Sequence, residues 1–465
     1  MSILNIGTSA LTTAQTALST TSNNISNVNT EGYSRQRADQ VTRPSNYEGG
    51  FYLGAGVTVS SVERIYDSFL ANQVRSYTSQ EAQQSSFLSY SRQVDNMLGS
   101  AELGINEGLG AFFGAIQEVA NDPTSVSARQ VMLTQGELLA NRFNTMDGQL
   151  TQLERNIDND IAVAVDDINN ITRGIAELNQ AILEAEGSAS GADPNDLLDK
   201  RDQLINQLSE FVSVTTVQQS NGTVNVFIGS GQGLVVGSSQ VDLTTLSDSS
   251  FDPPRLNIGF GPSSQDITSQ VTGGSLGGAL QFRTQIIDDT RAELDLLAQS
   301  LVTAFNTAHG NGFDMDGNAG GNFFDPTAIT AGDINVVITD PRAIAASSGV
   351  NTGPGNNENA LALADLQTDS SVVQVSAGPP AVTRSLSDQY AVIVSDVATR
   401  TRQAEVSQQT QQALLQQTRQ RFDSVSGVNL DEEAANLIKY QQAYQAASQI
   451  IVVSNTIFES LISAV

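Results

Sequence analysis

The sequence predicts a multidomain α+β protein with terminal coiled-coil helices, a long helical-bundle rod domain and an inserted, mainly-β outer domain. Three observations support this prediction. Apolar residues recur at helical spacing over several long stretches, a strand-like block with an Asn-Gly turn interrupts them, and both ends carry seven-residue repeats. A chain of 465 residues is long enough for about two to four domains with their own cores.

The first expected element is a helix near the N-terminus that ends at about Gly32. Apolar residues recur every seven positions from Leu4 to Ile25, and the first 30 positions hold no charged side chain. A helix this rich in Ser, Thr and Asn has poor intrinsic propensity and lacks the charged face of an ordinary surface helix. We therefore expect neighbouring helices to complete it. The residues expected at this assembly interface are Leu4, Leu11, Leu18, Asn24, Ile25, Asn27 and Val28.

The last expected element is a helix with the same repeat, beginning near Leu430. Asn429 and Glu432 resemble a capping box at its start. Two terminal heptad stripes suit a coiled-coil pair, packed either inside one monomer or between chains. The terminal positions and the missing charge favour packing between chains. The residues expected at this interface are Leu437, Tyr440, Tyr444, Ala447, Ile451, Phe458 and Leu461.

The segments between the two ends predict the rod and the β domain. Apolar seams at 157–182 and 280–304 indicate long helices, and a Gln-rich helix is expected at about 387–422. The block FVSVTTVQQSNGTVNVFIG alternates on both sides of Asn221-Gly222, which is a strong hairpin signal. A further strand is expected at Ile334–Thr339. The β domain is therefore predicted from two separate parts of the chain.

Composition excludes several classes of partner and site. The 22 Lys and Arg against 50 Asp and Glu give a net charge of −28, which disfavours nucleic acids and anionic membranes. Cys is absent and His occurs once, so Cys-based and multi-His metal sites are excluded. No apolar run approaches the ~20 residues that span a bilayer, and we expect no Sec-type signal peptide. We expect no cofactor, no metal, no nucleic acid and no membrane.

Two short motifs resemble catalytic or metal-binding patterns. GGSLG at 273–277 fits the G-x-S-x-G elbow, whose Ser275 would need His309 as its base. A connecting helix would place His309 ~45 Å away, so a glycine-rich helix entry is favoured. DMDGN at 314–318 resembles a calcium loop but lacks the glycine at position six and the glutamate at position twelve, which favours a plain turn. We expect no enzyme and no catalytic residues.

Several blocks of the sequence resemble those of a known protein family. TTSNNISNVNTEGYSRQ (20–36) is similar to the N-terminal signature shared by flagellar rod, hook and hook-associated proteins, and GAGVTVSSVERIYDSFL (54–70) follows it. More specific are DLLDKRDQLINQLSEFV (196–212), GGSLGGAL (273–280) and SGVNLDEEAANLIKYQQAYQAASQII (426–451). Together these blocks resemble the flagellar hook-associated protein 1 family, and the resemblance covers most of the chain.

The resemblance implies a structural protein that polymerises at the distal end of the hook and forms the hook–filament junction. Its terminal helices would form the inner tube of the axial structure. The implied partners are other copies in the junction layer, the hook protein below, the next junction protein or filament above, an export chaperone at the C-terminal helix and the flagellar type III export apparatus. The implied location is extracellular, in the flagellum. Another axial protein of hook or rod type, or a soluble coiled-coil adaptor, is the alternative.

The expected organisation follows from these assignments. It comprises an N-terminal axial helix with a loop or strand at 1–65, rod helices at 66–210, the inserted β domain at 211–272, a rod helix at 273–312, a second β part at 313–350, the return of the rod at 351–425 and the C-terminal axial helix at 426–465. Because loop closure costs grow slowly with length, we expect the β domain to be dispensable for docking.

Overall fold

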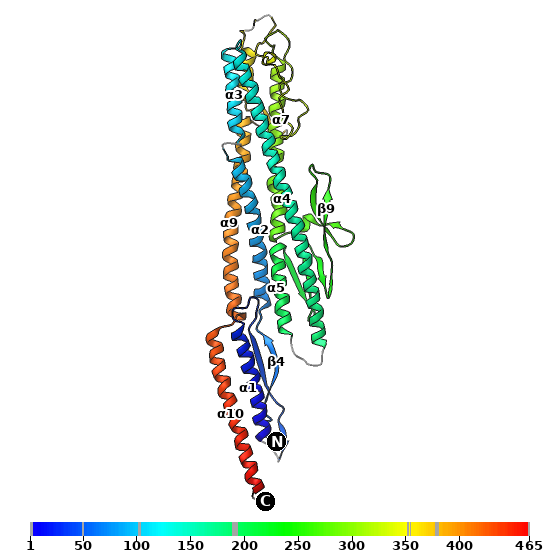
Figure 1. The fold of residues 1–465 in the computed structure, drawn as a ribbon, viewed down its shortest axis with the longest axis vertical. Helices are drawn as coiled ribbons and strands as arrows, with labels where there is room; N and C mark the ends of the chain where they lie inside the picture. The colour runs from blue at the N-terminus through cyan, green and yellow to red at the C-terminus, as the bar shows by residue number, and fades with distance from the viewer. Residues whose placement is uncertain are drawn as a thin grey trace.

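The computed structural model describes residues 3–463 except 49–50, 101–103, 188–193, 351–352, 354 and 377–380. These residues form a long, narrow molecule (Figure 1). A pair of terminal helices lies at one end, a helical rod extends from it, and a β domain lies on the flank of the rod. The α+β multidomain class predicted from the sequence is confirmed.

The terminal pair consists of α1 (Ile3–Ser26) and α10 (Leu430–Ser463). They are antiparallel, because Asn24 lies beside Glu433 whereas Gly7 lies beside Ile450. The labelled N- and C-terminal ends therefore lie at the same end of the molecule (Figure 1). An antiparallel ribbon of β1 (Gln36–Thr42) and β4 (Val57–Arg64) packs on α1. Beyond it, β2 (Asn46–Glu48) pairs with β3 (Phe51–Leu53).

Long helices form the rod, and most of them run along its axis (Figure 1). They are α2 (Ser68–Leu98), α3 (Ile105–Asn121), α4 (Val126–Gly187), α5 (Asn195–Phe211), α6 (Gly274–Phe282), the π-helical turn η2 (Arg283–Asp288), α7 (Asp289–Gly310), α8 (Glu358–Asp365) and α9 (Leu386–Ser426). The α4 seam is buried as predicted, with Ile157, Ile168 and Ile182 fully inaccessible to solvent. Such a stripe of apolar residues at helical spacing explains why the 62-residue α4 is stable within a bundle.

The Gly-rich block at 273–280 allows two close approaches in the rod. Gly273 and Gly274 have φ of +71° and +63°, which places them in the left-handed region at the start of α6. A side chain at Gly278 would place its Cβ 2.3 Å from the Gln83 carbonyl oxygen of α2. The block therefore turns the chain into α6, as the favoured interpretation of a glycine-rich helix entry predicts. It also lets α6 contact the α2 backbone.

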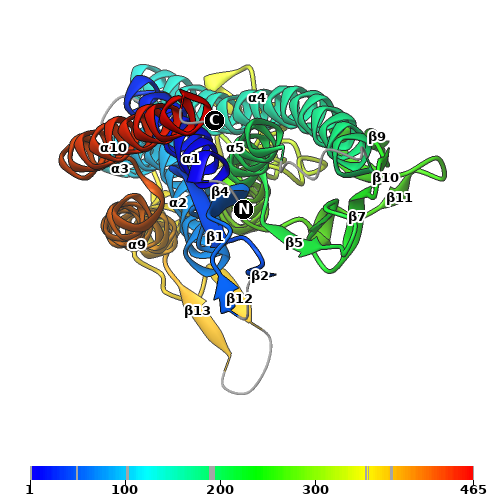
Figure 2. The same cartoon turned by 90° about the horizontal axis from the view of Figure 1, so that it is seen from below.

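Two antiparallel sheets form the β domain. One has the order β5-β6-β7-β8 and the other β11-β10-β9. Their strands are β5 (Val214–Gln218), β6 (Val224–Ile228), β7 (Gln232–Val236), β8 (Ser239–Gln240), β9 (Leu243–Asp248), β10 (Arg255–Phe260) and β11 (Gln265–Asp266). Asn221-Gly222 forms the turn between β5 and β6, with Gly222 at φ +77°, so the predicted hairpin is confirmed. Viewed along the rod, this domain and the small hairpin of β12 (Val373–Ser376) and β13 (Val382–Arg384) project in different directions (Figure 2).

The β domain shares its core with the rod. Its two ends meet as an insertion requires, since the Ser213 amide donates to the Thr272 carbonyl at 2.8 Å. However, the buried side chains of β6 and β10, such as Val226 and Ile258, belong to the same apolar cluster as Ile168 of α4. The expectation of a dispensable insertion therefore lacks its physical basis, because removing the domain would expose the apolar face of α4 to water.

Residues 313–350 do not form the expected second part of the β domain. Phe323 and Phe324 instead pack with Phe112 of α3 and Phe305 of α7, at the end of the rod far from the terminal pair. Within 313–350 the structure has single β-bridges rather than strands, including Phe324 with Val336. The alternation at Ile334–Thr339 reflects alternating burial over this aromatic cluster, and the prediction of a strand there is wrong.

Candidate assembly interface

Helix α1 buries its small residues and leaves its leucine stripe partly exposed. Ala14, Ala17 and Thr21 are buried against neighbouring elements. A Cβ atom at Gly7 would lie 3.1 Å from side-chain atoms of both Ile450 and Ile451, so the absence of a side chain there lets the two helices approach closely. The apolar residues of the seven-residue repeat do not lie on this buried face of α1. Leu4 is 36 % exposed, and Leu11, Leu18, Ile25, Asn27 and Val28 are half-buried.

Helix α10 has very little of its surface buried. Within its described residues, Glu433 and Ala447 are the buried ones. Of the predicted interface residues, Ala447 contributes to packing inside the monomer, Leu437, Tyr440 and Ile451 are half-buried, and Tyr444, Phe458 and Leu461 are exposed. Beyond Ile451 the helix extends past the start of α1 (Figure 1). The apolar side chains in this last part are 47–64 % exposed, namely Val452, Val453, Ile457, Phe458, Leu461 and Ile462.

The terminal segments carry little of the net charge. Residues 1–65 hold four arginines against four carboxylates, and residues 427–465 hold one lysine against four carboxylates. Nearly all of the net charge of −28 therefore lies on the rod and the β domain. Because like charges repel through the solvent, this distribution favours contact between copies at the terminal pair over contact along the rods.

By length and composition alone, one helical stretch within Leu386–Ser463 is apolar enough to cross a membrane, with 6 % of the apolar window buried. A single stretch of this kind is weak evidence for a membrane span. Its exposed apolar residues are those of α10 described above. The terminal pair thus presents an apolar surface without a partner inside the monomer.

Asn24, expected at the interface, is instead buried in the region where the terminal pair meets the rod. This region, which contains residues 33–36 and Glu433, is called the joint. Its Oδ1 accepts from the Gln36 amide at 2.9 Å and from the Tyr33 hydroxyl at 2.8 Å, and its Nδ2 donates to the Gln36 carbonyl at 2.8 Å. Burial, together with the charge of Asp199, raises the pKa of the Tyr33 phenol above its ordinary range. A side chain engaged in this way cannot also contact another copy. The sequence signature here therefore serves the internal joint.

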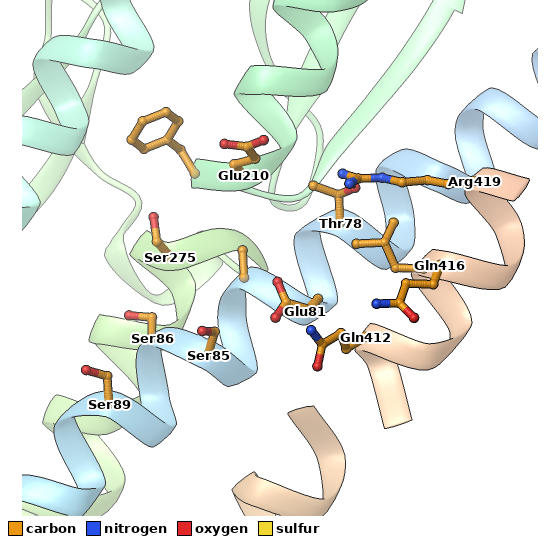
Figure 3. Close-up of a pocket in the computed structure, with 13 residues that line it drawn as sticks. Thr78, Glu81, Ser85, Ser86, Ser89, Glu210, Ser275, Gln412, Gln416 and Arg419 are labelled. Carbon is orange, nitrogen blue, oxygen red and sulfur yellow. The ribbon is translucent and has the colours of Figure 1, made fainter. Parts of the chain in front are cut away.

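Ser275 and His309 do not form a catalytic pair. Ser275 lies on the wall of an open cavity of about 660 Å³ between α2, α5, α6 and α9, together with Glu81 and Gln412 (Figure 3). His309 is fully buried in the aromatic cluster at the far end of α7. Both of its ring nitrogens are engaged by the backbone, Nδ1 with the Gly321 carbonyl at 2.7 Å and Nε2 with the Ala345 amide at 2.9 Å. This imidazole cannot serve as a base for Ser275.

The 314–318 loop is the plain turn that was favoured. Asp314 Oδ1 accepts from the backbone amides of Asp316 and Asn318, each at 2.8 Å, and Gly317 has φ +81°. Asp316 forms an ion pair with Arg342 rather than converging with Asp314. Among the described residues, no group of three or more potential ligands is placed to hold a metal ion.

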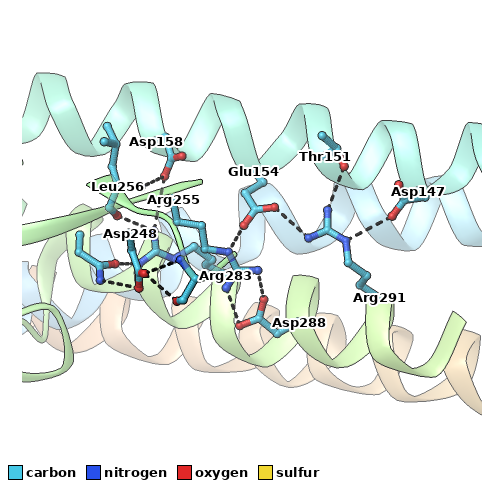
Figure 4. A network of polar contacts seen from close by, with 12 residues as sticks. Asp147, Thr151, Glu154, Asp158, Asp248, Arg255, Leu256, Arg283, Asp288 and Arg291 are labelled. Atoms are coloured by element: carbon cyan, nitrogen blue, oxygen red, sulfur yellow. Dashed lines mark hydrogen bonds and ion pairs between the residues drawn. The ribbon is translucent and has the colours of Figure 1, made fainter. Parts of the chain in front are cut away.

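A buried network of charges joins the β domain to the rod (Figure 4). Arg255 of β10 pairs with Glu154 of α4 and with Asp288 of η2, and Arg291 of α7 pairs with the same Glu154 at 2.9 Å. The Glu154 side chain is 1 % exposed. Beside them, Arg283 donates to the Leu256 carbonyl at 2.7 Å, and burial lowers its pKa. These contacts tie β10 of the β domain to α4, η2 and α7 of the rod.

Comparison with known protein families gives three matches along the chain. The model described as the flagellar hook-associated protein FlgK helical domain matches residues 91–324. The flagellar basal body rod FlgEFG protein C-terminal model matches residues 419–464, and the flagella basal body rod protein model matches residues 4–33. The matches at the two ends cover the α1 and α10 helices described above.

Two proteins similar to this chain over nearly its whole length are both flagellar hook-associated protein 1. The flagellar hook-associated protein 1 of Escherichia coli strain K12 is 32 % identical over 99 % of each chain, and that of Bacillus subtilis strain 168 is 28 % identical over 98 % of this chain and 96 % of its own. Among solved structures, the flagellar hook junction protein FlgK from Burkholderia pseudomallei has a TM-score of 0.69 at 21 % identity, covering 76 % of this chain and 100 % of its own. This last likeness concerns the fold.

Proposed function

Because this chain belongs to the flagellar hook-associated protein 1 family, whose members are structural proteins of the bacterial flagellum, we propose that it polymerises at the distal end of the hook and forms the hook–filament junction. One observation carries this proposal. The terminal pair presents an apolar surface that the monomer leaves uncovered, and α10 supplies most of it. Other copies, packed side by side, would cover it.

The exposed part of α10 is large enough to drive such packing. Fully burying one large apolar side chain contributes about 1.5–3 kcal/mol, and the six exposed residues beyond Ile451 are each about half accessible. Each would therefore add ~1 kcal/mol on assembly. The half-exposed leucine stripe of α1 would contribute in the same way, since α1 and α10 lie side by side.

The proposal names further partners. Copies in the junction layer would contact one another through the terminal pair, with the hook protein below and the next junction protein or the filament above. An export chaperone would cover the apolar face of α10 before assembly, since amphipathic helices suit groove-binding partners. The flagellar type III apparatus would then deliver the chain to an extracellular position. The match of both ends to rod-protein families supports a shared mode of axial packing.

The decisive experiment inserts a charge into the proposed interface. In the Phe458→Asp variant, a carboxylate replaces a side chain that is 64 % exposed in the monomer. Assembly would bury that charge without a partner, which is strongly unfavourable. Electron microscopy of isolated hooks incubated with the protein should show a cap for the wild type and none for the variant. The thermal unfolding of the monomer should not change.

The matched control is Val163→Asp on α4, where the replaced side chain is 60 % exposed and lies on the rod. This variant should cap hooks as the wild type does. Normal capping by Phe458→Asp would show that α10 does not enter the junction and would remove the basis of the proposal. The Phe458→Asp variant should also lose affinity for the export chaperone, measured by titration calorimetry, whereas Val163→Asp should keep it.

A further inference from the structure

Glu433 is an exception on α10. Its side chain is 2 % exposed on a helix whose other acidic residues face solvent. Its Oε1 accepts from Arg35 Nε at 2.7 Å, and its Oε2 accepts from Asn24 Nδ2 at 3.2 Å. Arg35 also contacts Glu432 at 2.5 Å through Nη1. The Arg35 guanidinium therefore contacts two carboxylates in the first turn of α10. These charge-assisted hydrogen bonds require a specific geometry between donor and acceptor.

The backbone of Arg35 connects the same point to two further elements. Its amide donates to the Ser426 carbonyl at the end of α9 at 2.9 Å, and its carbonyl accepts from the Ile65 amide at 2.7 Å. Residue 35 thus meets the end of α9, the start of α10 and the segment between β4 and α2. Both stretches of chain that connect the terminal pair to the rod, the one before α2 and the one after α9, therefore have a backbone contact with this residue.

A second set of charges continues the contacts into the rod. The Ser34 amide donates to Asp199 of α5 at 3.0 Å, and Arg64 at the end of β4 pairs with Asp199 at 3.1 Å and with Asp202 at 2.6 Å. Arg75 of α2 pairs with the same Asp202 at 2.8 Å. These side chains are 6–15 % exposed, so solvent screens their interactions only weakly.

The two terminal helices contribute little apolar packing across this joint, where the aromatic contact is the edge-on packing of Tyr66 against Phe422. Helices α1 and α10 pack mainly on each other and on β1 and β4 rather than on the rod helices. A cavity of about 290 Å³ remains between the joint and the rod, lined by Tyr33, Tyr66, Asp199 and Phe422 among others. The polar contacts therefore carry the geometric restraint. An arginine fork suits this task, because its planar donors fix the direction of a carboxylate partner.

We propose that Arg35 is a positioning residue for assembly: through Glu433 on one side and the Ser34–Asp199 contact on the other, it sets the angle at which the rod carries the apolar face of α10. This inference rests on the proposed function, because the angle matters only if α10 packs in the junction. Loss of the contact would leave both parts folded and would let the terminal pair change its direction relative to the rod.

The absence of cysteine allows a direct measurement of the angle in the full chain. Spin labels at Gln417→Cys on α9 and Gln442→Cys on α10 lie at exposed positions on either side of the joint. The two helical stretches span about 32 Å at 1.5 Å rise per residue, and the link between α9 and α10 adds at most about 14 Å. The separation is therefore at most about 46 Å, within reach of pulsed electron resonance. The distance distribution should be narrow in the parent protein, and Arg35→Gln should widen it at least about twofold.

Two comparisons make the test specific. Arg92→Gln removes an exposed pair with Glu405 on the rod and should leave the distribution narrow. Glu433→Gln keeps the shape of the buried side chain and removes its charge, so it should widen the distribution as Arg35→Gln does, which provides a second measurement if Arg35→Gln fails to fold. Hook capping should fall by about tenfold or more for both joint variants, the loss expected from about 1.4 kcal/mol.

The outcomes separate this inference from the proposed function. A narrow distribution in both joint variants would overturn the positioning role, as would a wide distribution accompanied by normal capping. If the parent protein itself fails to cap hooks, the proposed function is wrong, and the positioning role in assembly is refuted with it. The distance measurements would then still report on the joint as a structural contact.

Discussion

The single histidine of the chain should make the far end of the rod sensitive to acid. His309 is fully buried, and its Nε2 accepts from the Ala345 amide. An amide can only donate, so Nε2 carries no proton, and Nδ1 must be the nitrogen that donates to the Gly321 carbonyl. This arrangement exists only for the neutral ring. Protonation at Nε2 would set two donors against each other and break the Ala345 contact.

Burial, assisted by the positive charge of Arg129, holds the pKa of His309 below its ordinary value of 6.5, although the hydrogen bond to the Gly321 carbonyl acts in the opposite direction. Arg129 is 1 % exposed and donates to the carbonyls of Pro123 and Ile344. Burial lowers the pKa of Arg129. The negative charge of Asp314 raises this pKa, and the positive charge of Arg342 lowers it. Between the lowered pKa and 6.5 the unfolded state binds more protons, so stability is lost as the pH falls through this window. The loss is about 1.4 kcal/mol per pH unit.

Two measurements test this expectation. With one imidazole in the chain, NMR of histidine-labelled protein gives its titration without assignment, and the pKa should lie below 6.5. Hydrogen exchange of residues 313–347, corrected for the intrinsic rate, should show an opening equilibrium that rises about tenfold per pH unit as the pH falls from 6.5 to the lowered pKa of His309. In His309→Gln this dependence should disappear. A ring that titrates at 6.5 or higher, or an equal acid response in the variant, would refute the reasoning.

Three further substitutions test the packing of the rod and the β domain. Gly278→Ala should lower the free energy of unfolding in urea by about 1–3 kcal/mol, because the new Cβ would lie 2.3 Å from the Gln83 carbonyl oxygen. In the control Gly114→Ala on α3, the new Cβ meets no atom within 4 Å, so this variant should be slightly more stable. Equal effects of the two substitutions would contradict the close contact of α6 with α2. Asn179→Ala should lower the free energy of unfolding by about 2–4 kcal/mol and raise hydrogen exchange in β6. The Asn179 side chain donates to the Val224 carbonyl at 2.8 Å, accepts from the Val224 amide at 3.1 Å and also accepts from the buried Arg201. Unchanged exchange in β6 would show that other contacts hold the domain. Glu154→Ala should lower the free energy of unfolding by about 3–5 kcal/mol, because it leaves buried arginines without one of their partners. Asp316→Ala removes an exposed ion pair and should lower it by less than about 1 kcal/mol. Similar losses in both variants would refute the view that the network in Figure 4 acts as a buried unit.

The regular parts of the fold could be predicted from the sequence because their signals are local. The seam of α4 recurs at helical spacing over many turns, and Asn221-Gly222 marks a turn whose conformation few other residue pairs adopt. The terminal repeats likewise gave the two helices that α1 and α10 form. In each case neighbouring residues carry the whole signal.

The rest depends on contacts between distant segments. Alternation at Ile334–Thr339 is the same whether the partner is a strand or an aromatic cluster, and Phe112 lies more than two hundred residues away. The heptad leucines of α1 are the obvious interface residues, yet the monomer packs through Gly7, Ala14 and Ala17 because small residues permit close helix contact. The burial of Glu433 left no local sign, since its partner Arg35 comes from the other end of the chain.

The pairing of α1 with α10 also sets an order of events for a folding chain. Asn24 and Glu433 are 409 positions apart, so their contact closes nearly the whole sequence into a loop. The entropy cost of that closure falls once the rod has folded, because the rod already brings the end of α9 beside the segment after α1. A chain that stops before residue 430 has a rod but no α10, and its α1 has no helix to pack against. The paired surface can therefore form only on a chain translated through α10, so truncated products lack the element that would let them join others.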